Sequence, residues 1–348
     1  MDRRTRFLNA CRQLPVDRPP VWIMRQAGRY MPSYRAVRKK VSFLELCRSP
    51  ELACEVTLMP IDQIGVDAAI LFSDILVPLE TMGLEVDFNP GPHIADPVRS
   101  RADVDALRVK GAAEGLGYVY DALSTIRKAL PEDVPLLGFA GAPWTLATYA
   151  IEGGTSKNHH EIKRLMYAEP AALDALLEKL VEVVIAYGRR QVEAGAEAIQ
   201  LFDTWGGLLS VDQWERFSGR YTKRIFEGLR DTGVPLVHYV KDGAHLLHAL
   251  TALPCDVLSV DWRVTLGDVR HATGGSFALQ GNIDPGVLRA GEDVISDAVK
   301  RCLDSYGDGP GHIVNLGHGI TPDVTVGAAK ALVDAVKQLG PAYGGQPT

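Results

Sequence analysis

Short apolar runs recur along the chain, and each is followed by a longer stretch in which apolar residues repeat at helical spacing. Runs of this length are typical of strands buried in a parallel sheet. The first run also follows Pro19-Pro20, a pair that disfavours a helix at that point. In chain order the eight runs are 21–24 (VWIM), 68–72 (AAILF), 136–140 (LLGFA), 198–202 (AIQLF), 235–239 (PLVHY), 256–260 (DVLSV), 277–280 (FALQ) and 312–316 (HIVNL).

The stretches between the runs predict helices. In the first of them, Ser49-Pro50-Glu51 supplies an N-cap, a first-turn proline and a first-turn acid for its second half. After the second apolar run, Glu85–Phe88 and the segment NPGPHIADP (89–97) predict an inserted hairpin. The expected helices are 43–64, 118–130, 169–193, 211–230 and 321–339.

Eight strands that alternate with helices, without any linker of low complexity, predict one α/β domain, a single (β/α)8 TIM barrel over residues 1–348. Residues 1–20 form a basic lead-in and 340–348 a loose tail. Two ordinary domains also fit the length. A doubly wound sheet would need a phosphate-binding glycine fingerprint, but GAAEGLG at 111–117 has the wrong spacing and GPGHIVNLGHG places its first glycines before the strand.

Composition is that of a soluble globular enzyme, with 46% hydrophobic and 23% charged residues. The first residues, MDRRTRFLNACRQL, lack the apolar core of a secretory signal, and no apolar run is long enough to cross a membrane. Five scattered cysteines without a CxxC pair predict reduced thiols and a cytoplasmic location.

Positive charge is concentrated at the start of the chain. Residues 1–40 hold eleven Arg and Lys against two Asp, a balance of +9, so with −6 overall the remainder carries −15. An acidic protein without a basic run interleaved with aromatics does not predict nucleic-acid binding. The basic segment indicates either a focused site for a small polyanion or arginines that pair with the acidic remainder, and counting charges leaves both open.

In a TIM barrel the functional side chains come from the C-terminal ends of the strands. Here those ends bring cations, one early carboxylate, hydroxyl groups and a late histidine to one mouth. Neither a GxSxG elbow nor three ligands at metal spacing occur. The strand-end candidates are Arg25, Arg29, Ser73, Asp74, Tyr149, Phe202, Asp203, Thr204, His238, Tyr239, Asp261, Asn282, Asp284 and His318.

Several candidates have a structural alternative. Asp74 points into the mouth, or it caps the following turn or pairs with an arginine. Tyr149 reaches the site or packs in the core. The glycines on either side of His318 indicate close approach of a ligand or a tight turn. His159-His160 is interpreted as a solvated lid or surface loop, and His238 and Asp261 as packing or supporting residues.

The ordered motifs PPVWIMRQAGRYMPSYR, FSDIL, GFAGAPWTLATYAIEGG, FDTWGG, LQGNIDP and NLGHGI resemble the uroporphyrinogen decarboxylase family over nearly the whole chain. The resemblance implies a (β/α)8 barrel that acts as a homodimer. It also implies removal of the carboxyl groups from the four acetate side chains of uroporphyrinogen III, which gives coproporphyrinogen III and CO2 in haem biosynthesis. Neither a metal nor an organic cofactor is expected.

By this resemblance Asp74, Arg25 and Tyr149 are catalytic. Asp74 would accept hydrogen bonds from the pyrrole N–H groups and stabilise the positive charge that develops on the ring. Arg25 would be the proton donor, although a guanidinium with a pKa above about 12 is a weak acid at neutral pH. His318 would meet a propionate, made partly cationic by a nearby carboxylate. The implied substrate-binding set is Arg25, Gln26, Ala27, Gly28, Arg29, Asp74, Tyr149, Phe202, Thr204 and His318.

Two other functions stay open. A methyltransferase of the same barrel superfamily would use a zinc-bound thiol and would want a His-x-Cys pair, whereas His238 is followed by Tyr239-Val240 and His318 by Gly319-Ile320. A tetrapyrrole carrier without catalytic activity would bind the same polyanion and leave its carboxyl groups intact.

Overall fold

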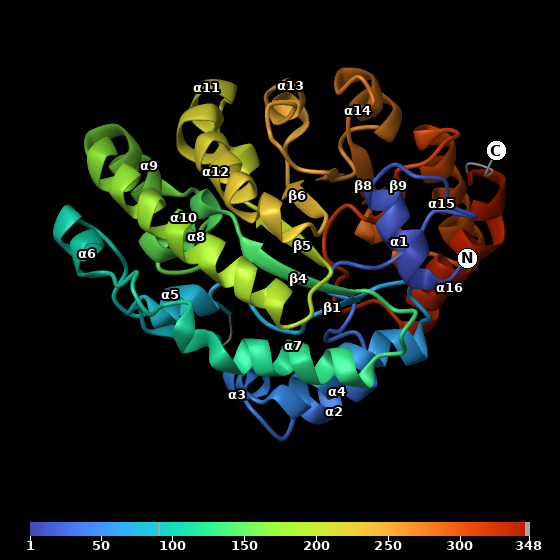
Figure 1. Cartoon of the computed structure of the whole chain (residues 1–348), viewed down its shortest axis with the longest axis horizontal. Helices are drawn as coiled ribbons and strands as arrows, with labels where there is room; N and C mark the ends of the chain where they lie inside the picture. Colours follow the sequence, from blue (N-terminus) through green and yellow to red (C-terminus); the bar gives the residue numbers. More distant parts are fainter. Residues whose placement is uncertain (90, 345–348) are drawn as a thin grey trace.

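Seven of the eight predicted strand segments form one parallel sheet that curls into a barrel (Figure 1). The computed structural model describes residues 1–89 and 91–344. Strand order is β1-β4-β5-β6-β7-β8-β9, so each strand pairs with the next one along the chain after a helical crossover. The strands are β1 (Ala69–Ile70), β4 (Leu136–Gly141), β5 (Ala198–Asp203), β6 (Leu236–Val240), β7 (Val257–Val260), β8 (Ala278–Ile283) and β9 (His312–Leu316).

The predicted first strand is not a regular strand, although it occupies the expected place. Val21 forms a single parallel bridge to Val314 of β9, and on its other side its carbonyl accepts a 2.7 Å hydrogen bond from the N–H of Asp67, just before β1. The regular pattern of backbone hydrogen bonds between strands stops after Val21, because side-chain amides bind the backbone N–H groups of Ile23 and Met24. Asn315 accepts from the Met24 N–H at 2.9 Å, and Gln26 accepts from the Ile23 N–H at 3.1 Å. Residues 20–24, the closing segment, therefore complete the barrel between β9 and β1.

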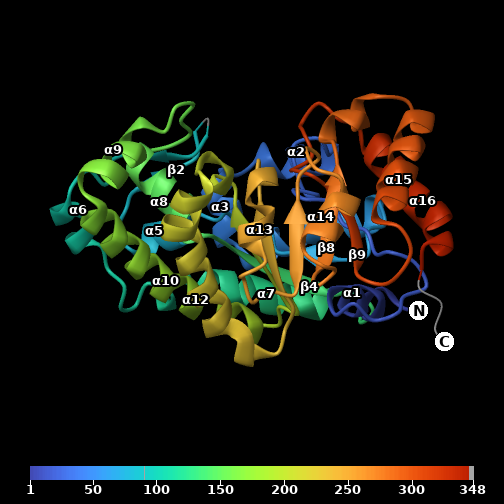
Figure 2. The same ribbon diagram turned by 90° about the horizontal axis from the view of Figure 1, so that it is seen from above.

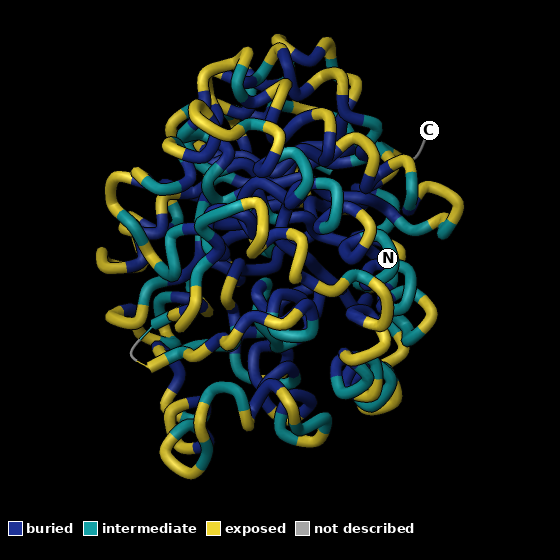
Figure 3. Tube along the Cα trace, turned by 90° about the vertical axis from the view of Figure 1, so that its left-hand side faces the viewer, coloured by how far each residue is buried: buried dark blue, intermediate teal, exposed yellow. Residues whose placement is uncertain are grey.

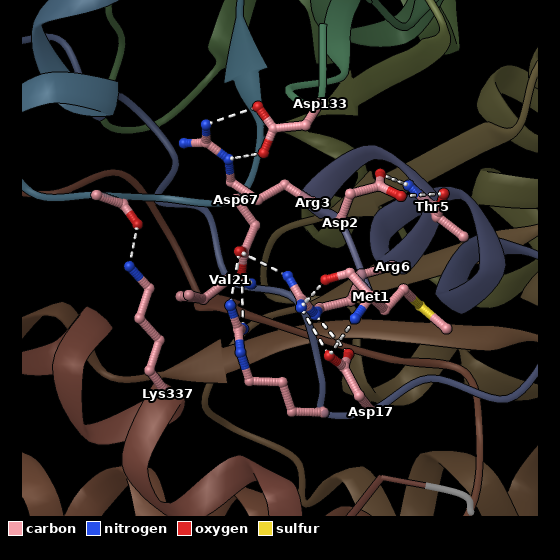
Figure 4. A network of polar contacts seen from close by, with 12 residues as sticks. Met1, Asp2, Arg3, Thr5, Arg6, Asp17, Val21, Asp67, Asp133 and Lys337 are labelled. Atoms are coloured by element: carbon pink, nitrogen blue, oxygen red, sulfur yellow. Dashed lines mark hydrogen bonds and ion pairs between the residues drawn. The ribbon is translucent and has the colours of Figure 1, made fainter. Parts of the chain in front are cut away.

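A buried carboxylate fastens the closing segment to the start of β1 (Figure 4). Asp67 is fully buried and receives two 2.7 Å hydrogen bonds from Arg18, one of 3.3 Å from Arg6 and one of 2.8 Å from the Val21 N–H. Arg6 also pairs with Asp17 at 2.7 Å. A buried ion pair is stable only when its remaining donors and acceptors are satisfied, and this network meets that condition.

Helices cover the outside of the sheet, and the predicted hairpin is present. Strand β2 (Val86–Asp87) pairs antiparallel with β3 (His93–Ile94), and His93 also bridges to Gly154, so the hairpin lies beside α8 and α9 (Figure 2). The α-helices are α1 (Arg3–Cys11), α2 (Pro32–Arg38), α3 (Phe43–Arg48), α4 (Pro50–Gln63), α5 (Val77–Thr81), α6 (Arg101–Ala106), α7 (Gly117–Ala129), α8 (Pro143–Glu152), α9 (His160–Ala168), α10 (Pro170–Glu193), α11 (Val211–Trp214), α12 (Arg220–Leu229), α13 (Leu247–Leu250), α14 (Leu266–Ala272), α15 (Glu292–Tyr306) and α16 (Val326–Leu339).

Predicted helix boundaries agree with the structure except at three places. The stretch expected to be helical over 43–64 contains two helices, α3 and α4, which meet at the predicted N-cap Ser49. The helix expected over 211–230 is interrupted by a π-helical turn at Glu215–Gly219. The helix expected from residue 321 begins at Val326, because the Thr325 hydroxyl accepts from the Ala328 N–H and caps it. The basic lead-in contains α1, with Asp2 as its N-cap. The expected loose tail begins with a short 3-10 turn, Gly340–Ala342, and residues 345–348 lie outside the described part of the chain.

Buried residues form one continuous core from Phe7 to Val336, and exposed residues lie mainly on loops and outer helix faces (Figure 3). On α10, the apolar residues that the sequence places at helical spacing are buried. Among the described residues, no helix is both long enough and apolar enough to cross a lipid bilayer. This frame leaves one end of the barrel open for the site.

Candidate active site

A cavity of about 530 Å³ opens at the C-terminal ends of the strands. That volume is in the range of small-molecule sites. All ten residues of the implied binding set line it: Arg25, Gln26, Ala27, Gly28, Arg29, Asp74, Tyr149, Phe202, Thr204 and His318. Residues from five separate parts of the chain therefore meet in one space, as the strand-end rule predicts.

The loop after the closing segment turns sharply at Arg25, whose φ of 63° is in the left-handed region. Its side chain lies against Gly319, where an added Cβ would be 2.4 Å from the Arg25 Cδ. An added Cβ on Gly317 would be 2.6 Å from the Trp262 backbone N. The two glycines beside His318 therefore allow close approach of Arg25 and Trp262, which are parts of the protein itself.

The buried Gln26 side chain stabilises this loop with two hydrogen bonds to backbone groups. It is 1% exposed, its amide oxygen accepts from the Ile23 N–H, and its amide nitrogen donates to the Ala68 carbonyl at 3.0 Å. The amide contact expected from Gln26 is therefore made inside the protein. By contrast, no hydrogen bond within the described residues uses the backbone N–H groups of Ala27, Gly28 and Arg29. Consecutive N–H groups after a left-handed residue form a concavity suited to anions.

Seven of the eleven cations in the first forty residues fall into two groups. Four arginines of the lead-in are tied to carboxylates: Arg3 to Asp133, Arg4 to Glu197, and Arg6 and Arg18 to Asp67. Around the cavity, Arg25, Arg29 and Arg38 have no carboxylate within 4 Å in the described part of the chain. These three arginines carry positive charge that a bound anion can neutralise.

Arg38 is the cavity cation that the predicted site omits. It lies on α2 four residues after Tyr34, another cavity residue, so both occupy the same helix face. The signal was available in the sequence, because Pro32 marks a helix start and the spacing of 34 and 38 follows from it.

Asp74 fills both roles that the sequence left open. Its Oδ1 accepts from the Leu76 N–H at 2.9 Å and so caps the turn that leads into α5, while the residue also lines the cavity. Burial raises the pKa of Asp74 above the ordinary aspartate value, and the Leu76 hydrogen bond and the Arg25 charge oppose that rise. No donor reaches its Oδ2 from the described residues. A bound ligand with N–H groups can therefore supply one.

Apolar and aromatic groups form the rest of the wall. Phe202 packs edge-on against Phe139 with ring centroids 5.8 Å apart, and Phe72 lies 5.6 Å from Tyr34. Tyr149 projects from α8 with its ring 5.9 Å from that of Trp205. Burial and the Asp74 charge raise the pKa of Tyr149, so its hydroxyl keeps its proton at neutral pH and can donate.

His318 differs from the expectation of a partly cationic side chain. Burial, reinforced by the charges of Arg25 and Lys241, lowers the pKa of His318 to about 4. The carboxylate of Asp242 opposes this shift without overcoming it. The imidazole is therefore neutral near pH 7. Its Nδ1 lies 3.0 Å from the hydroxyl of Tyr239, and the two rings stack at 12°.

Other strand-end candidates lie away from the cavity. Asp203 is fully buried and accepts from Thr145 at 2.8 Å and Ser218 at 2.7 Å. His238 packs against Trp214 and Phe226, in agreement with its structural alternative. Asp261 also agrees with its structural alternative, because it accepts from the Arg263 N–H. Asn282 and Asp284 were expected at the mouth, but they bond to neighbouring protein groups and do not line the cavity.

The expected surface loop at His159-His160 is only half correct. His160 is exposed, but His159 is 4% exposed, with its ring 4.8 Å from that of Trp205.

Across the described residues, no three His, Cys, Asp or Glu side chains are grouped so that they could hold a metal ion. The cavity thus combines unpaired cations, one half-buried carboxylate and an aromatic wall.

Comparison with known proteins places this arrangement in a family. The family model described as "Uroporphyrinogen decarboxylase (URO-D)" matches residues 2–339. A uroporphyrinogen decarboxylase from Geobacter metallireducens is 51% identical over 334 residues, 96% of this chain and 98% of that protein. Another, from Hydrogenovibrio crunogenus, is 49% identical and covers 97% of this chain and 98% of its own.

Among solved structures, a methyltransferase from Methanosarcina mazei has the same fold, with a TM-score of 0.82, 23% identity, and coverage of 97% of this chain and 99% of that one. At that identity the likeness concerns the fold alone. The family model and the two relatives carry the assignment: this chain belongs to the uroporphyrinogen decarboxylase family.

Proposed function

We propose that this protein removes the carboxyl groups of the four acetate side chains of uroporphyrinogen III, giving coproporphyrinogen III and CO2. The observation that carries the proposal is the set of three unpaired arginines that share an aromatic-lined cavity with one half-buried carboxylate, Asp74. A ring of four pyrroles with acetates and propionates at its edge has the complementary pattern: anions outside, N–H donors at the centre and apolar faces.

Asp74 supplies the central charge in this mechanism. Protonation of a pyrrole carbon next to an acetate arm makes the ring a cationic electron sink. The bond from the arm to its carboxylate then breaks, CO2 leaves, and the electron pair neutralises the ring. A proton then adds to the arm carbon, which becomes a methyl group, and the ring releases the first proton. A fixed anion beside the developing positive charge lowers the barrier, and such preorganised groups are typically worth about 3 kcal/mol.

The cations and backbone N–H groups at the rim hold the carboxylates. Arg29 and Arg38 offer forked guanidinium groups. Ala27 and Gly28 also line the cavity, and no acceptor within the described residues uses their backbone N–H groups. Arg25 lies close enough to Asp74 to affect its pKa, so it can orient the acetate that reacts and provide the proton for the ring. Tyr149 and Thr204 add hydroxyl donors, and Phe202 forms part of the wall.

Incubation of the protein with uroporphyrinogen III under reducing, anaerobic conditions tests the activity. Chromatography should show the eight-carboxylate substrate passing through seven-, six- and five-carboxylate species to the four-carboxylate product. A tetrapyrrole carrier would retain all eight carboxylates while bound. A methyltransferase would leave the substrate untouched. Either result would exclude decarboxylation as the function.

We further propose that the chain acts as a single domain, as a homodimer and in the cytoplasm. The continuous core from Phe7 to Val336 supports the single domain. All five cysteines are free and buried, which suits a reducing compartment. The dimer rests on family membership. Sedimentation equilibrium should give twice the chain mass of 37.8 kDa, and a monomer at micromolar concentration would contradict it.

A further inference from the structure

One buried hydroxyl next to the cavity contacts two groups at once. The hydroxyl of Tyr239, on β6, lies 2.9 Å from the Gly317 carbonyl oxygen and 3.0 Å from the Nδ1 of His318. Tyr239 is fully buried, so both contacts are made away from bulk water. In such a place, an unsatisfied polar group costs about 1–3 kcal/mol.

The chemistry of these two contacts determines where the protons lie. A carbonyl oxygen accepts hydrogen bonds and cannot donate them, and a tyrosine hydroxyl has one hydrogen to give. The Tyr239 hydroxyl must therefore donate to Gly317. Its oxygen can then receive a hydrogen bond from His318, which requires a hydrogen on Nδ1. In a neutral imidazole only one nitrogen carries a hydrogen, so Nε2 is left with a lone pair.

We propose that Tyr239 is a positioning residue that fixes His318 as the Nδ1–H tautomer, so that Nε2 offers a lone pair to the substrate in the cavity. This inference rests on the proposed function and deepens it. His318 lines the cavity, and Nδ1 is engaged by Tyr239, so Nε2 is the nitrogen left for a ligand. A substrate carboxylate cannot bind a lone pair directly. It binds there only when a proton joins Nε2, and substrate binding at His318 therefore takes up one proton.

The surroundings of His318 are consistent with this coupling. Arg25, Lys241 and Arg263 face it with positive charge, and Asp242 faces it with negative charge. Asp261 pairs with Arg263 at 3.0 Å and accepts from the Asp242 N–H. Burial and the three nearby cations keep the His318 imidazole neutral at pH 7, and the Asp242 charge opposes them without reversing the balance. A substrate with many carboxylates reverses the local balance and makes the protonated imidazole favourable.

Nitrogen NMR on the unliganded protein, labelled with ¹⁵N in its histidines, tests the tautomer. The His318→Gln variant identifies the His318 signals among the nine histidines. The wild type should show Nδ1 protonated and Nε2 unprotonated at pH 7. The Tyr239→Phe variant, which loses both contacts, should show a mixture of tautomers. A wild-type His318 with its hydrogen on Nε2, or one that is fully cationic, would overturn the proposal even if Tyr239→Phe failed to fold.

Calorimetry with coproporphyrinogen III, in buffers of different ionisation enthalpy, tests the proton uptake. The wild type should take up close to one proton more than His318→Gln at pH 7. The affinity of the wild type for coproporphyrinogen III should fall by up to tenfold for each unit of rising pH. The affinity of His318→Gln should lack this contribution to the pH dependence. Equal uptake in both proteins would refute the coupling. Failure of turnover would leave the NMR result intact, so the two proposals can be judged separately.

Discussion

The arginines of the first forty residues show how one residue type serves two purposes. Arg18 is engaged by a fully buried carboxylate, whereas Arg25, seven positions later, has no carboxylate within 4 Å in the described structure. Charge counting left binding and pairing as alternatives, and the structure assigns each arginine separately. Composition cannot make that distinction, because it depends on which acidic residue the fold places opposite each guanidinium.

Asp74 both caps a turn and lines the cavity, so one substitution there should affect activity and stability in different ways. Asp74→Asn should lower turnover by about 100- to 1000-fold, because a neutral amide cannot stabilise positive charge on the ring. The unliganded variant should be as stable as the wild type or more stable at pH 7–8. Asn keeps the oxygen that accepts from Leu76 and carries no charge for burial to disfavour.

The sign of the pH effect follows from the raised pKa of Asp74. The folded state disfavours the ionised carboxylate of Asp74, which lowers the free energy of unfolding of the wild type. This loss of stability is complete at pH values above the pKa of Asp74 in the folded state. It is absent at pH values below its pKa in the unfolded state, about 3.9. Any stability advantage of the variant should therefore disappear in acid. Urea unfolding at several pH values measures it, and the acid limb of wild-type activity should lie above pH 3.9. A variant that unfolds at neutral pH would contradict this account.

Gly319 is a second residue with a specific prediction. Because its hydrogen faces the stem of Arg25, Gly319→Ala should push the guanidinium away from Asp74 and lower kcat/KM more than tenfold. Overpacking of this kind costs about 1–3 kcal/mol in stability. Gly327→Ala is a matched control on α16, where an added Cβ meets nothing closer than 3.7 Å. Full activity in Gly319→Ala would show that the position of Arg25 is not critical.

At the scale of elements, hydrophobic patterns predicted the strands well and their interruptions poorly. The run VWIM is apolar enough for a strand, but the amides of Asn315 and Gln26 replace its backbone partners. The helix over 211–230 breaks near Gly219, where the Trp214 ring would lie 2.6 Å from an added Cβ. Asn315 lies 291 positions from Met24 in the sequence, so a window around residues 21–24 does not contain that partner. Gln26 and Trp214 are close in sequence to the residues they affect, but apolar periodicity does not describe their contacts.

The closing segment gives the prediction at this scale. Asp67→Asn leaves Arg18 and Arg6 without their buried partner, so the free energy of unfolding should fall by about 3–5 kcal/mol. Asp133→Asn removes a partly exposed pair with Arg3 and should cost no more than about 1 kcal/mol. Urea denaturation compares the two variants. Equal losses would mean that the Asp67 network contributes no more than a surface pair.

For the whole molecule, the strand-end rule brought together the right parts of the chain and included some wrong residues. Side chains alternate between the two faces of a strand. Phe202 lines the cavity, while Asp203 faces the helix layer, and His238 likewise packs outward next to the inward Tyr239. The alternation is visible in the sequence, and applying it would have removed both outward residues. The neutrality of His318 was not predictable, since it depends on burial and on charges from three separate loops.

The fold itself is shared with a methyltransferase of known structure, so the chemistry must be decided by the site. A zinc-dependent reaction needs three protein ligands, and the described residues contain no such group of His, Cys, Asp and Glu. Cys302 and His312 lie 3.9 Å apart, but no third His, Cys, Asp or Glu of the described residues joins them in a group that could hold a metal ion.

We therefore expect dialysis against EDTA, followed by 1,10-phenanthroline, to leave the rate of carboxyl loss unchanged. Metal analysis of the same samples should find less than one zinc for every ten chains. The rate depends, in this account, on a fixed carboxylate and on arginines that no chelator removes. If chelation abolished turnover and added zinc restored it, the anion at residue 74 would no longer suffice to explain how the ring accepts electrons.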